Sequence, residues 1–259
     1  MPEENQTNAT LYDVAGSIAR ITLNRPDKRN ALNDELIAGI KSGLRAAAAE
    51  QSIRVVVISG AGKDFCSGAD LSALQKISEA TIAENAADAR SMMELFTMMR
   101  DLPVPVVAAV HGRALAGGCG LASAADLVLA AESARFGYPE VKIGFVPAMV
   151  MAILKRNVSE KQAFELLTGC GEITARRGYE VGLVNQVFAD ETFEAEVQAY
   201  VSVFERMSKS AVSLSKALLY QIDGLAFREA IETGADVNVI ARLSADCQQG
   251  IAGFLKNRR

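Results

Sequence analysis

The residues best suited to chemistry in this sequence lie in two short segments rich in glycine and alanine. They cover positions 59–71 (SGAGKDFCSGADL) and 110–121 (VHGRALAGGCGL), and each follows a run of apolar, strand-forming residues. Small side chains let another molecule approach the backbone closely, and free N–H groups at the start of a helix carry partial positive charge. If the two segments face each other, their N–H groups could hold an oxyanion. Tight turns and close packing would explain the same glycines, and composition alone does not separate the two interpretations.

Glu140 is the most promising acid or base. It follows Tyr138-Pro139, and a carboxylate set in apolar surroundings has a raised proton affinity, which suits a general acid/base. A surface position after a proline turn, or a structural ion pair, is the alternative interpretation. The apolar neighbours that favour the functional one are Phe136, Val141, Ile143, Phe145 and Val146.

The other polar residues of the two segments have simpler interpretations. Asp70 stands just before a predicted helix, where capping is its expected role. We expect His111 to be a polar turn residue, and Cys66 and Cys119 to fill small volumes. Because His111 is the only histidine, an HExxH zinc site is excluded, and a Ser–His–Asp arrangement would have to use that residue. We therefore predict no metal site.

No cofactor-binding motif stands out in the chain. Gly60-Ala61-Gly62 is a partial dinucleotide fingerprint, but Phe65 occupies the place of its third glycine. A GxxxxGK[ST] phosphate loop is absent from the sequence. We therefore predict that the protein uses no separate cofactor.

Composition narrows the class of protein. The 259 residues include 27 Lys+Arg and 31 Asp+Glu, for a net charge of −4, and half of them are hydrophobic. This is typical of a globular protein with a sizeable core, and the acidic balance disfavours nucleic acid as a partner. No apolar run is long enough to cross a bilayer, and the polar N-terminus resembles neither a signal peptide nor a transit peptide. Four cysteines are best interpreted as free thiols, so we predict a cytoplasmic protein.

The pattern along the chain predicts an α/β protein. Two short strands at 11–15 and 18–23 flank a Gly-Ser turn, and further strands are expected at 53–59, 106–110 and 126–131. Asn33 is placed to cap a helix that follows it, and a long helix is expected at 80–100. From residue 149 to 254 the pattern is mostly helical, so the C-terminal part could be a separate layer or an oligomerisation element.

Six segments in this order resemble the crotonase, or enoyl-CoA hydratase/isomerase, superfamily. The resemblance runs from about residue 11 to 258, and the SGADL and ALAGG motifs are its most specific parts. The segments are ITLNRPDKRNALN (21–33), VVVISGAGKDFCSGADL (55–71), PVVAAVHGRALAGGCGLASAADLVLA (105–130), ARFGYPEVKIGFVP (134–147), LLTGCGEITARRGYEVGLVNQV (166–187) and CQQGIAGFLKNR (247–258).

The resemblance implies a crotonase-like spiral of ββα units at 11–195, which carries the CoA site, and a helical trimerisation region at 196–259. It implies an acyl-CoA substrate, whose coenzyme A is part of the substrate, an enzyme of fatty acid metabolism, and a homotrimer or hexamer. By motif, the N–H groups of Ala69 and Gly117 would hold the thioester carbonyl, and Glu140 in Gly-Tyr-Pro-Glu matches a catalytic glutamate. The implied substrate-binding residues are Lys28, Ala31, Ser67, Ala69, Asp70, Leu71, Ser72, Gly117 and Gly120.

Gly120 is where the chain departs from the family pattern. Besides the glutamate that Glu140 matches, hydratases of the family carry another glutamate three residues after the oxyanion glycine. In this chain that position is Gly120, and glycine cannot transfer a proton. The sequence then resembles single-glutamate hydratases of the methylglutaconyl-CoA hydratase-like kind, which we favour. A Δ3,Δ2-enoyl-CoA isomerase with one proton-carrying carboxylate is the second hypothesis. A decarboxylase or dehydratase that uses another residue, or a non-catalytic acyl-CoA binder, stays open.

Overall fold

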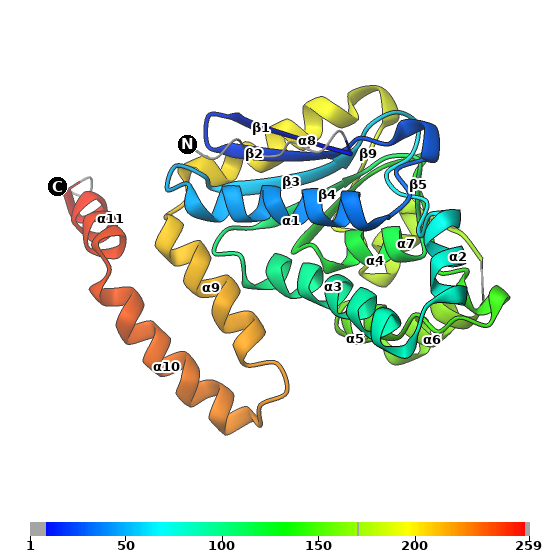
Figure 1. The fold of residues 1–259 in the computed structure, drawn as a ribbon. Coiled ribbons are helices and arrows are strands. Elements are labelled where there is room, and N and C mark those ends of the chain that lie inside the picture. The colour runs from blue at the N-terminus through cyan, green and yellow to red at the C-terminus, as the bar shows by residue number, and fades with distance from the viewer. Residues whose placement is uncertain (1–8, 170, 257–259) are drawn as a thin grey trace.

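A computed structural model describes residues 9–169 and 171–256, and for residues 71–74 only the backbone is described. Its main sheet has six strands in the order β1-β2-β3-β4-β6-β9 (Figure 1). β1 and β2 form an antiparallel hairpin, and the other neighbours pair in parallel. The strands are β1 Thr10–Ala15, β2 Ile18–Leu23, β3 Val55–Gly60, β4 Val106–Val110, β6 Leu127–Ala131 and β9 Gln186–Phe188.

A second, smaller sheet carries the strands next to the candidate site. Its order is β5-β7-β8, with bounds Arg113–Leu115, Arg135–Gly137 and Ile173–Thr174. β5 and β7 are parallel, and β7 and β8 are antiparallel. Because β5 and β7 run in the same direction, their C-terminal ends lie together, and the residues that follow them leave the sheet at the same end.

Eleven helices are described around these sheets, together with four short 3-10 turns. The helices are α1 Asp34–Ala49, α2 Leu71–Glu79, α3 Ile82–Asp101, α4 Gly117–Ala124, α5 Ala148–Asn157, α6 Glu160–Thr168, α7 Ala175–Val181, α8 Phe193–Ser202, α9 Lys209–Gln221, α10 Phe227–Leu243 and α11 Ala245–Lys256. The 3-10 turns are η1 Pro26–Lys28, η2 Glu140–Ile143, η3 Asp190–Thr192 and η4 Val203–Arg206.

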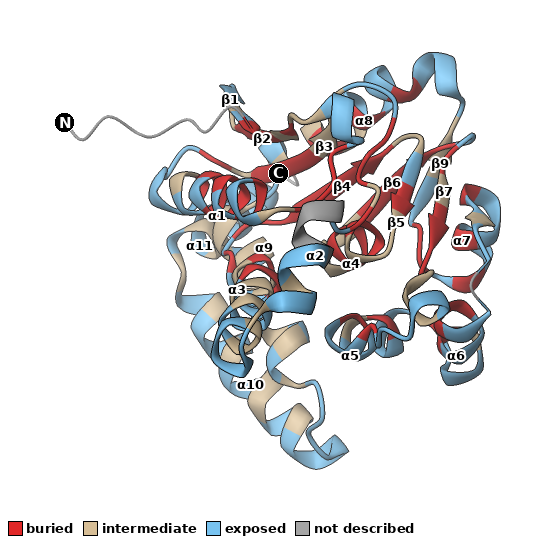
Figure 2. Ribbon diagram, turned by 45° about the vertical axis from the view of Figure 1, so that its right-hand side comes forward, coloured by how far each residue is buried: buried red, intermediate tan, exposed pale blue. Residues whose placement is uncertain are grey.

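The main sheet is buried on both faces, as Figure 2 shows for its central strands. On β3, Val56 and Ile58 face the core that α1 and α3 cover, whereas Val55 and Val57 face the core under α8. A parallel strand covered on both faces needs apolar residues at successive positions, which explains the β-branched run predicted at 53–59. The sheet is therefore a rigid support for the loops at its ends.

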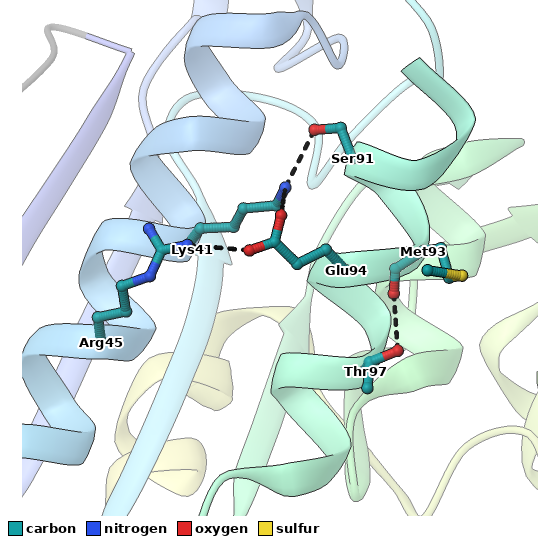
Figure 3. A network of polar contacts seen from close by, with 6 residues as sticks. All are labelled: Lys41, Arg45, Ser91, Met93, Glu94 and Thr97. Carbon is teal, nitrogen blue, oxygen red and sulfur yellow. Dashed lines mark hydrogen bonds and ion pairs between the residues drawn. The ribbon is translucent and has the colours of Figure 1, made fainter. Parts of the chain in front are cut away.

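α1 and α3 are joined by an ion-pair network that sets the position of α3. Lys41, 6% exposed, donates to Glu94 Oε2 at 2.8 Å and to Ser91 Oγ at 3.0 Å (Figure 3). Arg45 pairs with the other oxygen of Glu94 at 3.0 Å. The methionines of α3 are not all core residues, because Met93 is 54% exposed.

The last three helices extend away from the sheet as an arm (Figure 1). Lys216 of α9 anchors the arm, because its ammonium binds Asp126 Oδ2 at 2.7 Å and the carbonyls of Met99 and Val104 at 2.9 and 3.0 Å. Burial lowers the pKa of Lys216, and the Tyr220 hydroxyl donates to the same aspartate at 2.5 Å. The arm is thus attached through buried polar contacts.

Most of the predicted elements are confirmed. The hairpin, the strands at 106–110 and 126–131 and the long helix occur within a few residues of their expected bounds, and Asn33 accepts a hydrogen bond from Leu36 N–H at 2.9 Å as a cap. The segment 111–120 was expected to be a loop, but it contains β5 and the first four residues of α4. The predicted division at 195/196 stays a prediction, and it falls inside α8.

In the described part of the chain, no helix is both long and apolar enough to span a membrane.

Replacing Lys216 should weaken the attachment of the arm. Lys216→Ala removes the cationic partner of Asp126 and the donor to two carbonyls, and breaking such a buried ion pair typically costs about 3–5 kcal/mol. We therefore expect a much lower free energy of unfolding in chemical denaturation. Lys76→Ala is the matched control, because its ion pair with Asp34 is exposed and should contribute little. Equal effects of the two variants would contradict this account.

Candidate active site

The two Gly-rich segments of the sequence lie side by side. Cys66 N–H donates to the Arg113 carbonyl at 3.0 Å, and Leu115 N–H donates to the Cys66 carbonyl at 2.9 Å. These bonds form a parallel bridge between Cys66 and Ala114. The carboxylate of Asp64 adds a bond from Arg113 N–H at 2.9 Å. Residues 64–66 thus extend the small sheet on the side of β5.

The two segments are also in close contact at Gly68 and Ala116. A Cβ atom on Gly68 would lie 2.8 Å from the Ala116 Cβ, and the φ of +98° at Gly68 also favours glycine. Ala116 has φ +49° and ψ −127°, a conformation that costs a non-glycine residue free energy. The close contact lies one residue before Ala69 and one residue before Gly117, so it brings these two residues near each other.

The backbone N–H of Ala69 points away from its neighbouring strand. Leu32 donates to the Gly68 carbonyl at 2.7 Å and accepts from Asp70 N–H at 3.0 Å, in a parallel bridge with Ala69. In such a bridge the bonds are made by the residues flanking Ala69, so its own N–H faces the opposite side. Within residues 9–169 and 171–256, this N–H has no acceptor in the protein.

The backbone N–H of Gly117 is free for a different reason. Gly117 is the first residue of α4, and the first N–H groups of a helix have no partner within it. The first intrahelical bond runs from Gly120 N–H to the Ala116 carbonyl at 2.9 Å. The helix start also contributes partial positive charge. Ala69 and Gly117 therefore each leave one amide donor without an acceptor among the described residues, on two segments that are in contact.

Glu140 follows the C-terminal end of β7, at the same end of the small sheet as the start of α4. Leu115 of β5 is in register with Gly137 of β7, and Ala116 N–H donates to the Gly137 carbonyl at 2.8 Å. The chain then turns through Tyr138-Pro139 into η2, which begins at Glu140. Because the strands are parallel, the residues after β5 and β7 emerge together, which places Glu140 near the first turn of α4.

The carboxyl group of Glu140 lies in partly buried surroundings. Its Oε2 is buried and makes no hydrogen bond with the described residues, and burial raises the pKa of this half-buried group. Burial raises the pKa of Cys119 to about 12, and the charge of Glu140 adds to that shift. Since Cys119 lies two residues after Gly117, the field of Glu140 reaches the N-terminal turn of α4.

The two cysteines of the site are packing residues, as predicted. Cys66 and Cys119 are fully buried, and burial raises the pKa of Cys66 to about 12 as well. Nucleophilic cysteine chemistry needs the thiolate, which burial disfavours here. His111 is a turn residue whose Nε2 lies 2.9 Å from the Gly62 carbonyl, also as predicted.

The loop before α1 packs against the first Gly-rich segment and places the other predicted substrate-binding residues. Lys28 is exposed in η1, Ala31 is buried, and Ser67 N–H donates to the Arg29 carbonyl at 3.0 Å. Asp70 forms an ion pair with Arg25 at 2.7 Å. Leu71 and Ser72 begin α2, and their side chains lie outside the described part of the structure.

Sequence reasoning missed the residues that hold this loop. Asn30 is completely buried, and its amide nitrogen donates to the carbonyls of Ala61 and Asp64 at 2.9 and 2.7 Å. Asn30 has φ +53°, and asparagine tolerates the left-handed region better than most residues. The residue type was therefore the only signal in the sequence. Arg25 was also missed, because nothing local indicates its pairing with Asp70.

The described residues contain no cluster of three or more His, Cys, Asp or Glu side chains that could hold a metal ion. A cavity of about 660 Å³ lies at the other end of α4, between Ser123, Arg156 and Tyr220. The amide donors and Glu140 are thus at the N-terminal end of that helix, away from this cavity.

Comparison with known proteins identifies the family. The family model described as enoyl-CoA hydratase/isomerase matches residues 13–259. The chain belongs to this family. It is 35% identical over 240 residues to the 2,3-dehydroadipyl-CoA hydratase of Escherichia coli, with 92% of each chain covered. It is 32% identical over 244 residues to the crotonyl-CoA hydratase of Syntrophomonas wolfei, with 93% of each covered.

Solved structures of the family confirm the predicted crotonase fold. An enoyl-CoA hydratase from Mycobacterium smegmatis superposes with a TM-score of 0.92 at 30% identity, over 97% of each chain. The helical C-terminal part is consistent with the predicted trimerisation region. The protein is therefore an enzyme of the enoyl-CoA hydratase/isomerase family. The roles of Ala69, Gly117 and Glu140 stay predictions.

The unpaired carboxyl of Glu140 should cost stability when it is ionised. Its pKa is higher in the folded than in the unfolded protein, so stability falls as pH rises through the interval between the two values, and the cost persists above it. Glu140→Gln removes the charge, so we expect a higher Tm than wild type near neutral pH and a smaller difference in acid. Differential scanning calorimetry across pH measures this.

Glu165→Gln on the exposed side of α6 is the control for losing one carboxylate, and it should leave the Tm unchanged. A lower Tm for Glu140→Gln at neutral pH would mean that the carboxyl is stabilised by its surroundings.

Proposed function

We propose that this enzyme adds water across the C2–C3 double bond of an enoyl-CoA thioester. The observation that carries the proposal is the position of Glu140. Its half-buried carboxyl has one oxygen without a hydrogen-bond partner among the described residues, and it follows β7 where two free amide donors follow the neighbouring segments. The hydratase names of the relatives from E. coli and S. wolfei support it. Both names specify an acyl-CoA substrate.

The two amides would hold the thioester carbonyl oxygen. Addition of water at C3 moves electron density onto that oxygen, and an enolate-like anion develops. N–H groups of Ala69 and Gly117 stabilise this charge more than they stabilise the neutral carbonyl, which lowers the barrier. Removing one such donor typically costs about 2.7–4 kcal/mol of barrier.

Glu140 would transfer the proton. As the carboxylate it takes a proton from water while the water oxygen bonds to C3, and it then gives that proton to C2. The enolate collapses to the thioester, and Glu140 returns to its ionised form. The raised pKa of Glu140 suits both steps, because an acid/base works best when its pKa lies near the working pH.

Isomerisation of a 3-enoyl-CoA is the second candidate, and Gly120 is the observation that favours it. Position 120 is buried and has no acidic side chain, so one carboxyl serves the site. One carboxyl suffices to carry a proton between C4 and C2 without activating water. The choice between the two reactions depends on whether Glu140 also holds water at C3.

Further assignments belong to the same proposal. The CoA moiety would run past residues 28–31 and 69–72. A homotrimer, or a hexamer built from two trimers, would cover the apolar residues exposed on the arm, among them Phe227, Leu243 and Phe254. A cytoplasmic location, a role in fatty acid metabolism and the lack of a separate cofactor stay predictions.

Parallel absorbance assays on trans-2-enoyl-CoA and trans-3-enoyl-CoA test the reaction. We expect the wild type to consume the 2-enoyl chromophore, and Glu140→Gln to lose about 10²-fold or more of kcat with little change in the Kd for the substrate. Appearance of the 2-enoyl signal from the 3-enoyl substrate would identify an isomerase. Tight binding without turnover of either substrate would identify a non-catalytic binder.

Ala69→Pro tests the amide donor separately. The bridge to Leu32 uses the groups of residues 68 and 70, so proline at 69 deletes only the N–H that faces the site. We expect kcat to fall about 10²–10³-fold, with a smaller change in substrate Kd. Ala69→Ser keeps the N–H at an exposed position and should stay close to wild type. Equal losses of kcat and affinity would count against an oxyanion role.

A further inference from the structure

Position 120 and Val150 compete for one volume beside the two amide donors. Gly120 is buried in α4, and a Cβ atom placed on it would lie 2.6 Å from Val150 Cγ2. Real Cβ atoms essentially never approach a neighbour that closely. The space that a side chain at 120 would enter is therefore occupied by the valine of the neighbouring helix α5.

A single atom, Cγ2 of Val150, accounts for this conflict. The next nearest atoms to the same Cβ position are Phe96 Cζ at 3.5 Å and Val150 Cβ at 3.8 Å, both ordinary contacts. Val150 is 5% exposed, and a valine in a helix strongly prefers one χ1 rotamer, so moving the side chain aside costs free energy. Shortening Val150 to alanine would open the position, and no other residue would need to move.

The wall that contains Val150 begins at the first residue of α4. Positions 117 and 120 are one helical turn apart and share a face of α4. A Cβ on Gly117 would meet Leu32 Cδ1 at 3.0 Å and Met92 Cε at 3.6 Å, and one on Gly120 would meet Val150 and Phe96. This face of α4 is thus lined by four apolar side chains, beginning at the amide that would hold the thioester oxygen.

We propose that Val150 is a specificity-determining residue, which occupies the volume that an acidic side chain at position 120 would need and so restricts proton transfer to Glu140. This inference rests on the proposed function, in which an enoyl-CoA binds between Ala69 and Gly117. It makes residues 120 and 150 a coupled pair. An acid at 120 can take part in hydration only when residue 150 is small.

A double-mutant cycle in thermal unfolding tests the shared volume. Gly120→Ala alone should lower the Tm, by roughly 3–10 °C for a clash of this kind. In the Val150→Ala background the same change should leave the Tm unchanged or raise it, since alanine favours helix over glycine. Val158→Ala, in the residue that follows α5 and is similarly buried, is the matched control and should give no rescue. Additive effects of Gly120→Ala and Val150→Ala would overturn the proposal.

Hydration of trans-2-enoyl-CoA tests the chemical consequence. We expect Gly120→Glu alone to show a lowered Tm and no gain in activity. Gly120→Glu with Val150→Ala should hydrate at least about 10-fold faster than Val150→Ala alone, since a positioned acid/base group contributes about 10²–10⁴-fold. A second comparison adds Glu140→Gln to each variant. Gly120→Glu with Val150→Ala should still hydrate faster than Val150→Ala alone.

The outcomes separate this inference from the proposed function. A wild type without hydratase activity, together with a gain in the double variant, would support the role of Val150 and reject hydration as the native reaction. An active wild type whose folded double variant shows no gain would overturn the role of Val150 and leave the proposed function standing. A gain from Gly120→Glu alone, at wild-type Tm, would also overturn the role of Val150.

Discussion

The contact between Gly68 and Ala116 is the constraint on which the site depends. Two backbone amides can converge on one oxygen only if the chain segments that carry them lie almost in contact, and a Cβ at residue 68 would prevent this. Hydrogen bonds from Cys66, Leu115 and Ala116 fix the segments to each other and to β7. In the proposed reaction the donors would therefore be in place before a substrate binds, and no free energy would be lost in orienting them.

Several features of the site lower the stability of the fold. Ala116 has a positive φ, which typically costs about 1–3 kcal/mol, and Glu140 keeps a buried oxygen without a partner. Such features persist only when the surroundings determine the conformation. Here the surroundings are a sheet buried on both faces and the ion pairs of Lys41 and Lys216, which hold α3 and α9 in position. The rigid parts of the fold thus allow an unfavourable arrangement at the site.

Local patterns predicted the elements whose signals are local. The alternation in β2, the continuous apolar run of β3 and the cap at Asn33 each follow from neighbouring residues. The first turn of α4 was missed, because a Gly-rich stretch has low helix propensity and is helical here through contacts with distant residues. The same reason applies to Arg25 with Asp70 and to Gly120 with Val150, where partners 30 or more residues apart meet only in the folded chain. The sequence motifs identified Ala69, Gly117 and Glu140 as candidates. That these residues lie near each other follows only from the pairing of the strands that precede them.

The amide pair and the wall of α4 have different consequences for the reaction. An enolate-like anion develops in hydration and in isomerisation alike, so two N–H donors serve either reaction and cannot select between them. Selection depends on where a proton can be taken up and where water can be held. Val150 and Phe96 are apolar neighbours of position 120, so in the proposed reaction proton transfer would be confined to the side of Glu140. The difference between related enzymes would then arise from the packing of α5 against α4, while the two amides stay the same.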